Sequence, residues 1–232
     1  MIKIGVKVEG LDRVKAHLQG QAKQVAFATA VALTRTAQVI KDAMPGEMRK
    51  TLDRPTQFTT GGMFLRKANK NNLEAVVGFK DLQAGYMRYQ IEGGVRQAGR
   101  AGIKLPGNIE LNAFGNIPKG LISRLKAAAQ HGDLSGAIRK RLGVDGNRRK
   151  GASPIQLFYG KPKGKGWEKA PMGIWRRVPG TPGKLIPVIV FEDTPARYTK
   201  RFDFHGIAKR IVDREWNAQF ARALSEAMRS AK

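Results

Sequence analysis

The stretch VAFATAVALTRTAQVIKDAM, residues 25–44, decides the fold. Its apolar residues recur at the spacing of an α-helix, and the same pattern reaches back to Val14 and forward to Met44. In residues 25–33 nearly every position around the helix is apolar or small, so we expect other elements to cover more than one of its faces. The sequence therefore predicts one long, largely buried helix.

The boundaries of this helix have their own signals. Asp12 is placed to act as the N-cap, because its carboxylate can accept the unpaired amide hydrogens of a first turn. Pro45 followed by Gly46 predicts the end of the helix. Ahead of the cap, Ile2 to Val8 alternate between aliphatic and other residues, which is typical of a half-buried strand.

Downstream, short apolar runs separated by turn residues predict mostly strands. Residues 64–79 form a hairpin pattern around the turn-rich NKNN, while residues 85–91 fit either a short helix or a strand. Residues 117–130 read as a short helix. The segments 155–160, 173–178 and 185–192 are strand candidates, separated by basic loops.

The last thirty residues predict an amphipathic helix. Asp203 is a candidate N-cap, Phe202 and Ile207 are spaced as a hydrophobic staple, and apolar residues continue at helical spacing to Met228. The order of elements indicates the α+β class, with a mostly antiparallel sheet covered by the long N-terminal helix and this C-terminal helix. We expect a single domain over residues 1–232, with a long basic, loop-rich insertion at 139–187.

Charge is the most unusual property of the composition. The 232 residues hold 43 lysines and arginines against 18 aspartates and glutamates, a formal net charge of +25. Residues 139–187 alone carry thirteen basic residues against Asp145 and Glu168. Such an excess is best tolerated beside a polyanion or an acidic partner.

The composition also excludes several classes of protein. The chain has no cysteine, which rules out disulfides and thiolate metal sites. It has no run of about 18 apolar residues, so neither a membrane span nor a membrane partner is expected. We predict a chain that is made in, and stays in, a cytoplasm until it assembles.

No arrangement of residues points to catalysis. His17, His131 and His205 are widely separated, and Glu92 has no nearby acid, base or nucleophile. The segment GKPKGKG, residues 160–166, lacks the spacing of a phosphate-binding loop and its Ser or Thr. The sequence predicts no enzymatic activity, no cofactor and no metal.

Nucleic-acid binding is the alternative that the sequence keeps open. Phe158, Tyr159, Trp167 and Trp175 alternate with basic residues, a pattern that can neutralise phosphates and stack on bases. Equally, these aromatic residues can fill small cores beneath loops while the lysines lie in solvent. No helix-turn-helix, zinc-finger, RNP or KH signature accompanies them.

Four segments resemble a known group of proteins. Residues 32–37, ALTRTA, are followed by Arg54-Pro55-Thr56, then by Tyr86, Tyr89, Ile91, Glu92 and Gly93, and at the end by FARALSEAMRSAK. Their order and spacing resemble the tail-completion proteins of tailed bacteriophages, of the minor tail protein Z type, and the related neck proteins. Thr34 stands where that group usually has asparagine, and Gly94 where it has a small hydroxyl residue.

The resemblance implies a structural virion protein of the tail or neck. Such proteins form a homo-oligomeric ring, commonly sixfold, at the head-proximal end of the tail, for tail completion, tail termination or head-tail joining. The implied partners are the tail tube, terminator or head-connector proteins, with nonspecific DNA contact also open; assembly takes place in the host cytoplasm.

We expect basic residues to meet these partners or a polyanion. Within the stretch 85–102 we expect an aromatic-Glu-Gly strand end at 86–93, followed by a mobile basic loop at 95–102 that reaches a neighbour. The full set of expected contact residues is Arg88, Arg96, Arg100, Arg148, Arg149, Lys150, Lys161, Lys163, Lys165, Arg176 and Arg177.

Overall fold

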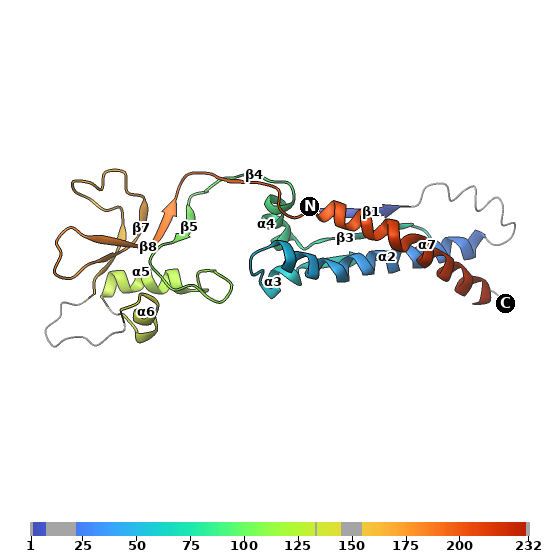
Figure 1. Ribbon diagram of the computed structural model, residues 1–232, viewed down its shortest axis with the longest axis horizontal. Coiled ribbons are helices and arrows are strands. Elements are labelled where there is room, and N and C mark those ends of the chain that lie inside the picture. The colour runs from blue at the N-terminus through green and yellow to red at the C-terminus, as the bar shows by residue number, and fades with distance from the viewer. Residues whose placement is uncertain (1, 8–21, 133, 145–154, 231–232) are drawn as a thin grey trace. The chain divides into compact units, whose positions relative to one another are not determined.

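The computed structural model describes residues 2–7, 22–132, 134–144 and 155–230. The chain divides into two compact units (Figure 1). Unit 1 is made of Met1–Gly94 and Tyr198–Lys232, and unit 2 is Val95–Arg197, inserted between them. The sequence predicted one domain elaborated at 139–187. The inserted unit is longer because it includes helices and a strand that precede the basic region, and it has a separate apolar core.

Unit 1 contains a three-stranded antiparallel sheet. Strand β3 (Glu74–Phe79) lies in the centre, between β1 (Lys3–Lys7) and β2 (Met63–Arg66). The register pairs Ile4 with Val77 and Leu65 with Val77, so β3 is bonded on both sides and its residues 75–79 are buried. The hairpin predicted in residues 64–79 is confirmed, and so is the N-terminal strand.

Two long helices complete unit 1. Helix α2 (Ala22–Thr51) packs on β2 and β3, and helix α7 (Phe204–Ser230) packs along α2, as Figure 1 shows. The helices meet through a cluster of four buried alanines, Ala28, Ala32, Ala223 and Ala227. Small residues let two helices approach closely. The small-residue stretch of α2 is therefore explained by its contact with α7.

The predicted end of α2 at Pro45 is wrong, because the helix continues through Pro45 to Thr51. A proline in a helix removes one backbone hydrogen bond. Here Met44 and Met48 are both fully buried on either side of it, and the Leu52 amide still donates to the Met48 carbonyl at 2.8 Å. Core packing offsets the local penalty. The predicted cap, Asp12, lies outside the described residues.

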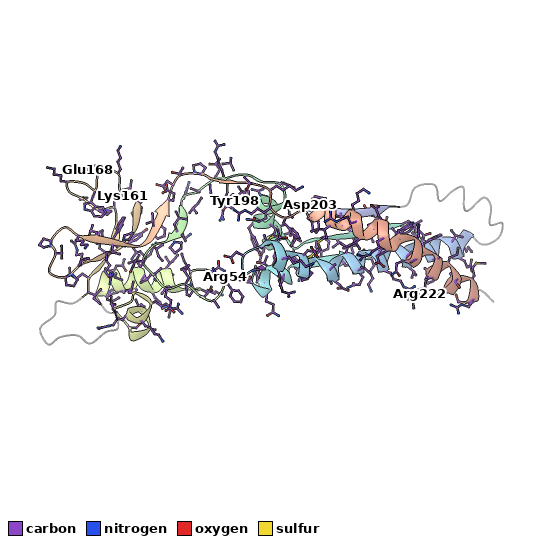
Figure 2. The ribbon with its side chains drawn as sticks, in the orientation of Figure 1. Arg54, Lys161, Glu168, Tyr198, Asp203 and Arg222 are labelled. Atoms are coloured by element: carbon purple, nitrogen blue, oxygen red, sulfur yellow. The ribbon has the colours of Figure 1, made fainter. Side chains whose placement is uncertain are left out.

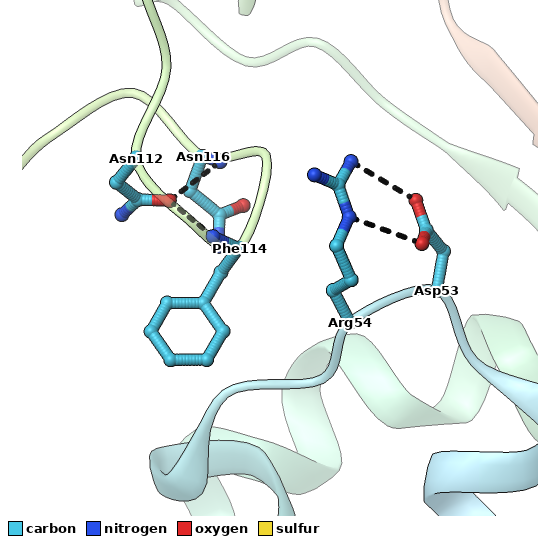
Figure 3. A network of polar contacts seen from close by, with 5 residues as sticks. All are labelled: Asp53, Arg54, Asn112, Phe114 and Asn116. Carbon is cyan, nitrogen blue, oxygen red and sulfur yellow. Dashed lines mark hydrogen bonds and ion pairs between the residues drawn. The ribbon is translucent and has the colours of Figure 1, made fainter.

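A short connection joins α2 to the sheet. Arg54 has a left-handed backbone with φ of +43°, and its guanidinium binds the Asp53 carboxylate at 3.2 and 3.4 Å (Figure 3). Thr56 then caps helix α3 (Gln57–Thr60) by accepting a hydrogen bond from the Thr59 amide. The Thr59 hydroxyl is in turn hydrogen-bonded to the Tyr86 hydroxyl at 3.0 Å.

Tyr86 lies on helix α4 (Asp81–Ile91), which follows β3 directly. The helix was one of the two alternatives for residues 85–91, and the expectation of a strand end at 86–93 is wrong. Met87 and Ile91, one turn apart, are buried in the unit 1 core, and this contact selects the helix. Glu92 is the exposed C-cap residue.

The start of α7 agrees with the sequence. The Asp203 carboxylate accepts a hydrogen bond from the Gly206 amide at 3.3 Å, as expected of an N-cap. Phe202 and Ile207 both lie in the unit 1 core. Ile207 and Ile211 of the predicted face are buried, but in the C-terminal half of α7 the most buried residues are Ala223 and Ala227, while Phe220 and Leu224 are only partly buried.

Unit 2 is built on a four-stranded antiparallel sheet. Its order is β5 (Ile103–Pro106), β8 (Leu185–Glu192), β7 (Met172–Arg177) and β6 (Leu157–Gly160), so the three predicted strands of residues 155–192 are confirmed. Helix α5 (Leu121–His131), also predicted, packs on one face, and the short helix α6 (Gly136–Arg141) adds to the same core.

Side chains also order a loop that precedes α5. The Asn112 Oδ1 atom accepts hydrogen bonds from the backbone amides of Phe114 and Asn116, at 3.0 and 2.9 Å (Figure 3). The Asn112 amide itself donates to the Asn116 carbonyl at 3.0 Å. An asparagine that bonds its own neighbouring backbone fixes a turn without any help from a core.

The chain passes between the units twice, and the two passages pair. Strand β4 (Gly94–Arg96) lies beside β9 (Ala196–Tyr198). The expected mobile loop at 95–102 is therefore wrong for its first part, which is a paired strand. Gly93 precedes it with φ of +76°, and a Cβ there would lie 3.0 Å from the Tyr198 carbonyl oxygen, so the position requires glycine.

The α+β class with antiparallel sheets and two long helices is confirmed. In the part of the chain that the structure describes, no helix is both long and apolar enough to cross a bilayer.

Candidate polyanion and partner interface

The loop between β6 and β7 concentrates exposed lysines. Lys161, Lys163 and Lys165 all face solvent, and Figure 2 shows Lys161 and Glu168 on this loop of unit 2. The Glu168 carboxylate accepts a hydrogen bond from the Gly166 amide at 2.9 Å. Its one acid therefore binds the backbone of the loop, and the three lysines keep their charge directed to solvent.

The two arginines at the end of β7 lie in different environments. Arg177 is exposed and its guanidinium lies over the Phe158 ring, 5.1 Å from the ring centre. Arg176 is half-buried, and its Nε atom is shielded from solvent without a hydrogen-bond partner. The structure brings both into unit 2 with the lysine loop, as expected, but Arg177 is the better placed of the two to meet an anion.

The structure shows a further cation–π contact in unit 2 that the sequence did not predict. Lys126 of α5 lies over the Tyr159 ring at 4.2 Å and near the Phe191 ring at 5.3 Å. These two rings meet edge to face at 5.8 Å. The three residues come from a helix and two strands far apart in the chain, so no local pattern could have indicated them. They place a further cation on the α5 face of the sheet.

The aromatic residues of unit 2 are used for internal packing. Trp175 is 4 % exposed and Trp167 packs edge-on to it at 5.5 Å. The rings of Phe158 and Tyr159 are each covered by a cation of the same chain. Tyr159 nevertheless remains 40 % exposed. The buried Trp175 fits the interpretation in which the aromatics fill small cores, and the partly exposed rings fit either interpretation.

Within the described residues of unit 2, no carboxylate forms an ion pair with a lysine or arginine. Residues 95–197 hold twenty lysines and arginines against six aspartates and glutamates. Every ion pair within 4 Å in the described parts of the chain joins residues of unit 1. The positive charge of unit 2 is consequently open to an external anion.

Hydrogen bonds explain what the acids of unit 2 do instead. Amide hydrogens of Glu168 itself and of Gly166 lower the pKa of the Glu168 carboxyl below its usual range. The hydroxyl and then the amide of Thr194 lower the pKa of Glu192, at 2.7 and 3.1 Å. Both acids order loops.

The other predicted contact residues are scattered. Arg88 lies on α4 in unit 1, where its guanidinium donates to the Tyr89 hydroxyl at 2.6 Å. Arg96 is exposed on β4, and Arg100 is exposed in the turn that precedes β5. These three are not in the lysine loop. Arg148, Arg149 and Lys150 lie outside the described residues.

Two of the three histidines lie within the described residues, and both are exposed. His131 is exposed at the end of α5, and His205 is exposed beside the Phe204 ring; His17 lies outside the described residues. Over the described ranges, no group of three or more His, Cys, Asp or Glu side chains is arranged to hold a metal ion. The candidate site consists of basic side chains at the surface of the protein.

Comparison of the chain with protein-family models, with curated proteins and with solved structures finds no match.

Proposed function

We propose that this protein is a noncatalytic structural subunit of a tailed-phage virion. In this role it forms a ring at the head-proximal end of the tail, as a completion, termination or neck protein. Unit 1 supplies the packed body of the subunit, and unit 2 presents basic loops to DNA or to acidic surfaces of neighbouring tail or connector proteins. The proposed location is the virion.

The observation that carries the proposal is the exposed, unpaired positive charge of unit 2. A chain of net charge +25 repels itself unless an anion accompanies it. Unit 1 offsets part of its charge with internal ion pairs, whereas the described part of unit 2 has none. An external polyanion or acidic protein would neutralise the remaining positive charge.

The residues that carry the resemblance support a structural role. Thr34 accepts a hydrogen bond from the Ala68 amide at 3.1 Å and so holds the β2–β3 hairpin against α2. Arg35 donates to Glu226 of α7 at 2.7 Å. Thr56 connects through Thr59 to Tyr86. Each of these side chains joins two elements of unit 1, and none is directed to a reacting group.

Assembly tests the proposal directly. The purified full-length protein is mixed with phage tail tubes that lack their head-proximal end, then examined by electron microscopy and analytical ultracentrifugation. We expect a ring on one end of the tubes. A protein that stays monomeric at every concentration and never associates with tubes contradicts the proposal.

Nonspecific nucleic-acid binding remains a second candidate, because the exposed lysine loop alone would support it. We expect the affinity for a short duplex to fall with salt, with a slope of about 0.9 per phosphate neutralised. Replacing Lys161, Lys163 and Lys165 together by Gln should reduce that slope. The matched control removes three exposed cations of unit 1, Lys23, Arg49 and Lys80. Equal loss in the two variants would contradict a specific role for the loop.

A further inference from the structure

An apolar groove lies on unit 1. It has a volume of about 620 Å³ and runs between α2 and the tip of the β2–β3 hairpin. Phe27, Ala30, Val31 and Ala68 line its apolar part, and Lys67 and Lys70 stand on its rim. Volumes of this size, roughly 300–1,000 Å³, are typical of binding sites.

The groove is preformed by hydrogen bonds behind it. The Thr34 hydroxyl fixes the hairpin to α2 through the Ala68 amide at 3.1 Å. At the hairpin tip, the Asn69 Oδ1 atom accepts from the amides of Asn71 and Asn72 at 2.9 and 2.8 Å. An occupant therefore does not have to order the walls, which lowers the cost of binding.

One apolar side chain of the groove is unusually exposed. Phe27 is 53 % exposed on a helix whose neighbouring positions Val25 and Ala28 are fully buried. Phe27, Val31 and Thr34 lie at positions i, i+4 and i+7, which form one stripe along about two turns, roughly 10 Å, of helix. The apolar face of a bound helix can pack along a stripe of this length.

The basic residues around the groove favour an acidic occupant. Lys67 and Lys70 are exposed, and no carboxylate lines the groove among the described residues. Arg35, which also lines it, uses Nη2 for Glu226 at 2.7 Å, while its Nη1 atom has no acceptor. An occupant with carboxylates beside its apolar residues would pair with this rim.

A second copy of the chain is a poor occupant. Among its own exposed apolar residues, Val95 precedes Arg96 and Leu105 follows Lys104, whereas Leu82 shares a hollow with both Lys80 and Asp81. Bringing these to a cationic rim adds like charges to a chain of net charge +25. The groove calls for a different protein.

We propose that this groove binds an acidic amphipathic helix of another protein, which inserts two large apolar side chains between Phe27 and the hairpin and pairs its carboxylates with Lys67 and Lys70. The inference does not depend on the virion role, because it stands on the groove and its charges alone.

The probe is a synthetic peptide of roughly 18 residues with leucines at i, i+4 and i+7, two glutamates beside that stripe to meet Lys67 and Lys70, and alanine and glutamine elsewhere to favour a helix. Two matched peptides replace the leucines by serine or the glutamates by lysine. Fluorescence anisotropy with the full-length protein at near-physiological salt should show binding of the leucine-glutamate peptide. Each matched peptide should bind at least about tenfold more weakly.

Variants assign the binding to the groove. Phe27→Glu should weaken the binding at least about tenfold, and so should Lys67→Glu with Lys70→Glu. The controls are Phe58→Glu, which changes a phenylalanine that is 58 % exposed elsewhere on unit 1, and Lys3→Glu with Lys80→Glu. Circular dichroism and thermal melting check that all variants fold.

Several results would overturn the proposal. These are the absence of peptide binding, equal binding of the serine peptide, and equal loss in the groove and control variants. Self-association of the wild-type protein that Phe27→Glu abolishes would assign the groove to a second copy instead.

Discussion

The two units of this chain treat their charges in opposite ways. In unit 1 carboxylates pair with cations: Glu226 binds both Arg35 and Arg222, and Asp203 binds Lys200. In the described part of unit 2 the acids Glu168 and Glu192 bind backbone amides and a hydroxyl instead. Unit 1 therefore offsets part of its positive charge with its own carboxylates, while the cations of the described part of unit 2 remain available to an anion outside the chain.

The hydrophobic cores of the two units also differ in composition. Unit 1 buries large side chains such as Phe79, Phe202 and Phe204, together with the methionines of α2. Unit 2 buries mainly aliphatic residues beneath α5, together with Phe191, and it also buries Trp175. Since the cores are separate, a change in one unit should leave the other folded. Four changes can break or sharpen this comparison.

The largest effect is expected from Phe79→Ala. This fully buried side chain packs 5.4 Å from the Phe204 ring, and its removal should lower the free energy of unfolding of unit 1 by about 3–5 kcal/mol. Hydrogen exchange with mass spectrometry should show lost protection in α2, β3 and α7 and unchanged protection in α5 and β8. Phe114→Ala, which changes an exposed phenylalanine, is the control. Equal loss in both units would mean that they unfold as one.

A second change overfills the contact between the long helices. Ala223→Leu places three further carbons in the alanine cluster of α2 and α7, which should cost about 1–3 kcal/mol. Ala221→Leu, on an exposed position of α7, should change stability by about 0.5 kcal/mol or less. Denaturant unfolding measures both. Similar values for the two variants would show that the helices are not closely packed there.

A third change removes a cap. Thr56→Ala deletes the hydroxyl that receives the Thr59 amide and contacts the Thr59 hydroxyl, at an expected cost of about 0.5–2 kcal/mol. Thr56→Ser keeps the hydroxyl and should restore most of the stability. If serine fails as badly as alanine, the methyl group and not the hydrogen bond is what matters at this position.

The smallest effect concerns acid. Hydrogen bonding from Arg35 lowers the pKa of Glu226, and that from Lys200 lowers the pKa of Asp203. A lowered pKa contributes stability above the ordinary pKa, near 4, that is lost as the pH falls through the lowered value. We therefore expect unit 1 to weaken in acid, and less so at high salt, where the ion pairs are already screened.

Unit 2 provides the counterpart of this experiment. Backbone and hydroxyl hydrogen bonds, not ion pairs, lower the pKa values of Glu168 and Glu192. Its loops should also loosen as the pH falls, but with little dependence on salt. Hydrogen exchange followed from neutral to acidic pH at two salt concentrations separates the two cases. An identical salt dependence would erase the distinction between the units.

Local signals predicted much of the fold. The Asp203 cap, the hairpin at 64–79 and the strands around 157–192 follow from short-range patterns, and all are found. Pro45 misled because the penalty of a proline is local, whereas the burial of Met48 that offsets it comes from the rest of the fold. For the same reason residues 85–91 were ambiguous until their core contacts were known.

The candidate interface was predictable only in part. Runs of basic residues indicated the exposed loop at 161–165. The contact of Lys126 with Tyr159 and Phe191, and the covering of Phe158 by Arg177, depend on strand register and could not be read from spacing. The groove beside Phe27 was likewise hidden, since a phenylalanine in a helical pattern is ordinarily a core residue.

The insertion of unit 2 has a consequence for biosynthesis. Helix α2 ends at Thr51 and helix α7, which covers it, begins at Phe204, so about 150 residues, including the whole of unit 2, are translated between them. At ribosomal speeds of about 5–20 residues per second, α2 waits roughly 8–30 seconds for its partner. During that time its alanine-rich side and the cavity left by Phe204 are open to chaperones or to aggregation. Strand β9, which pairs with β4, is the last strand synthesised before α7. Unit 1 can complete its folding only after α7 has followed it.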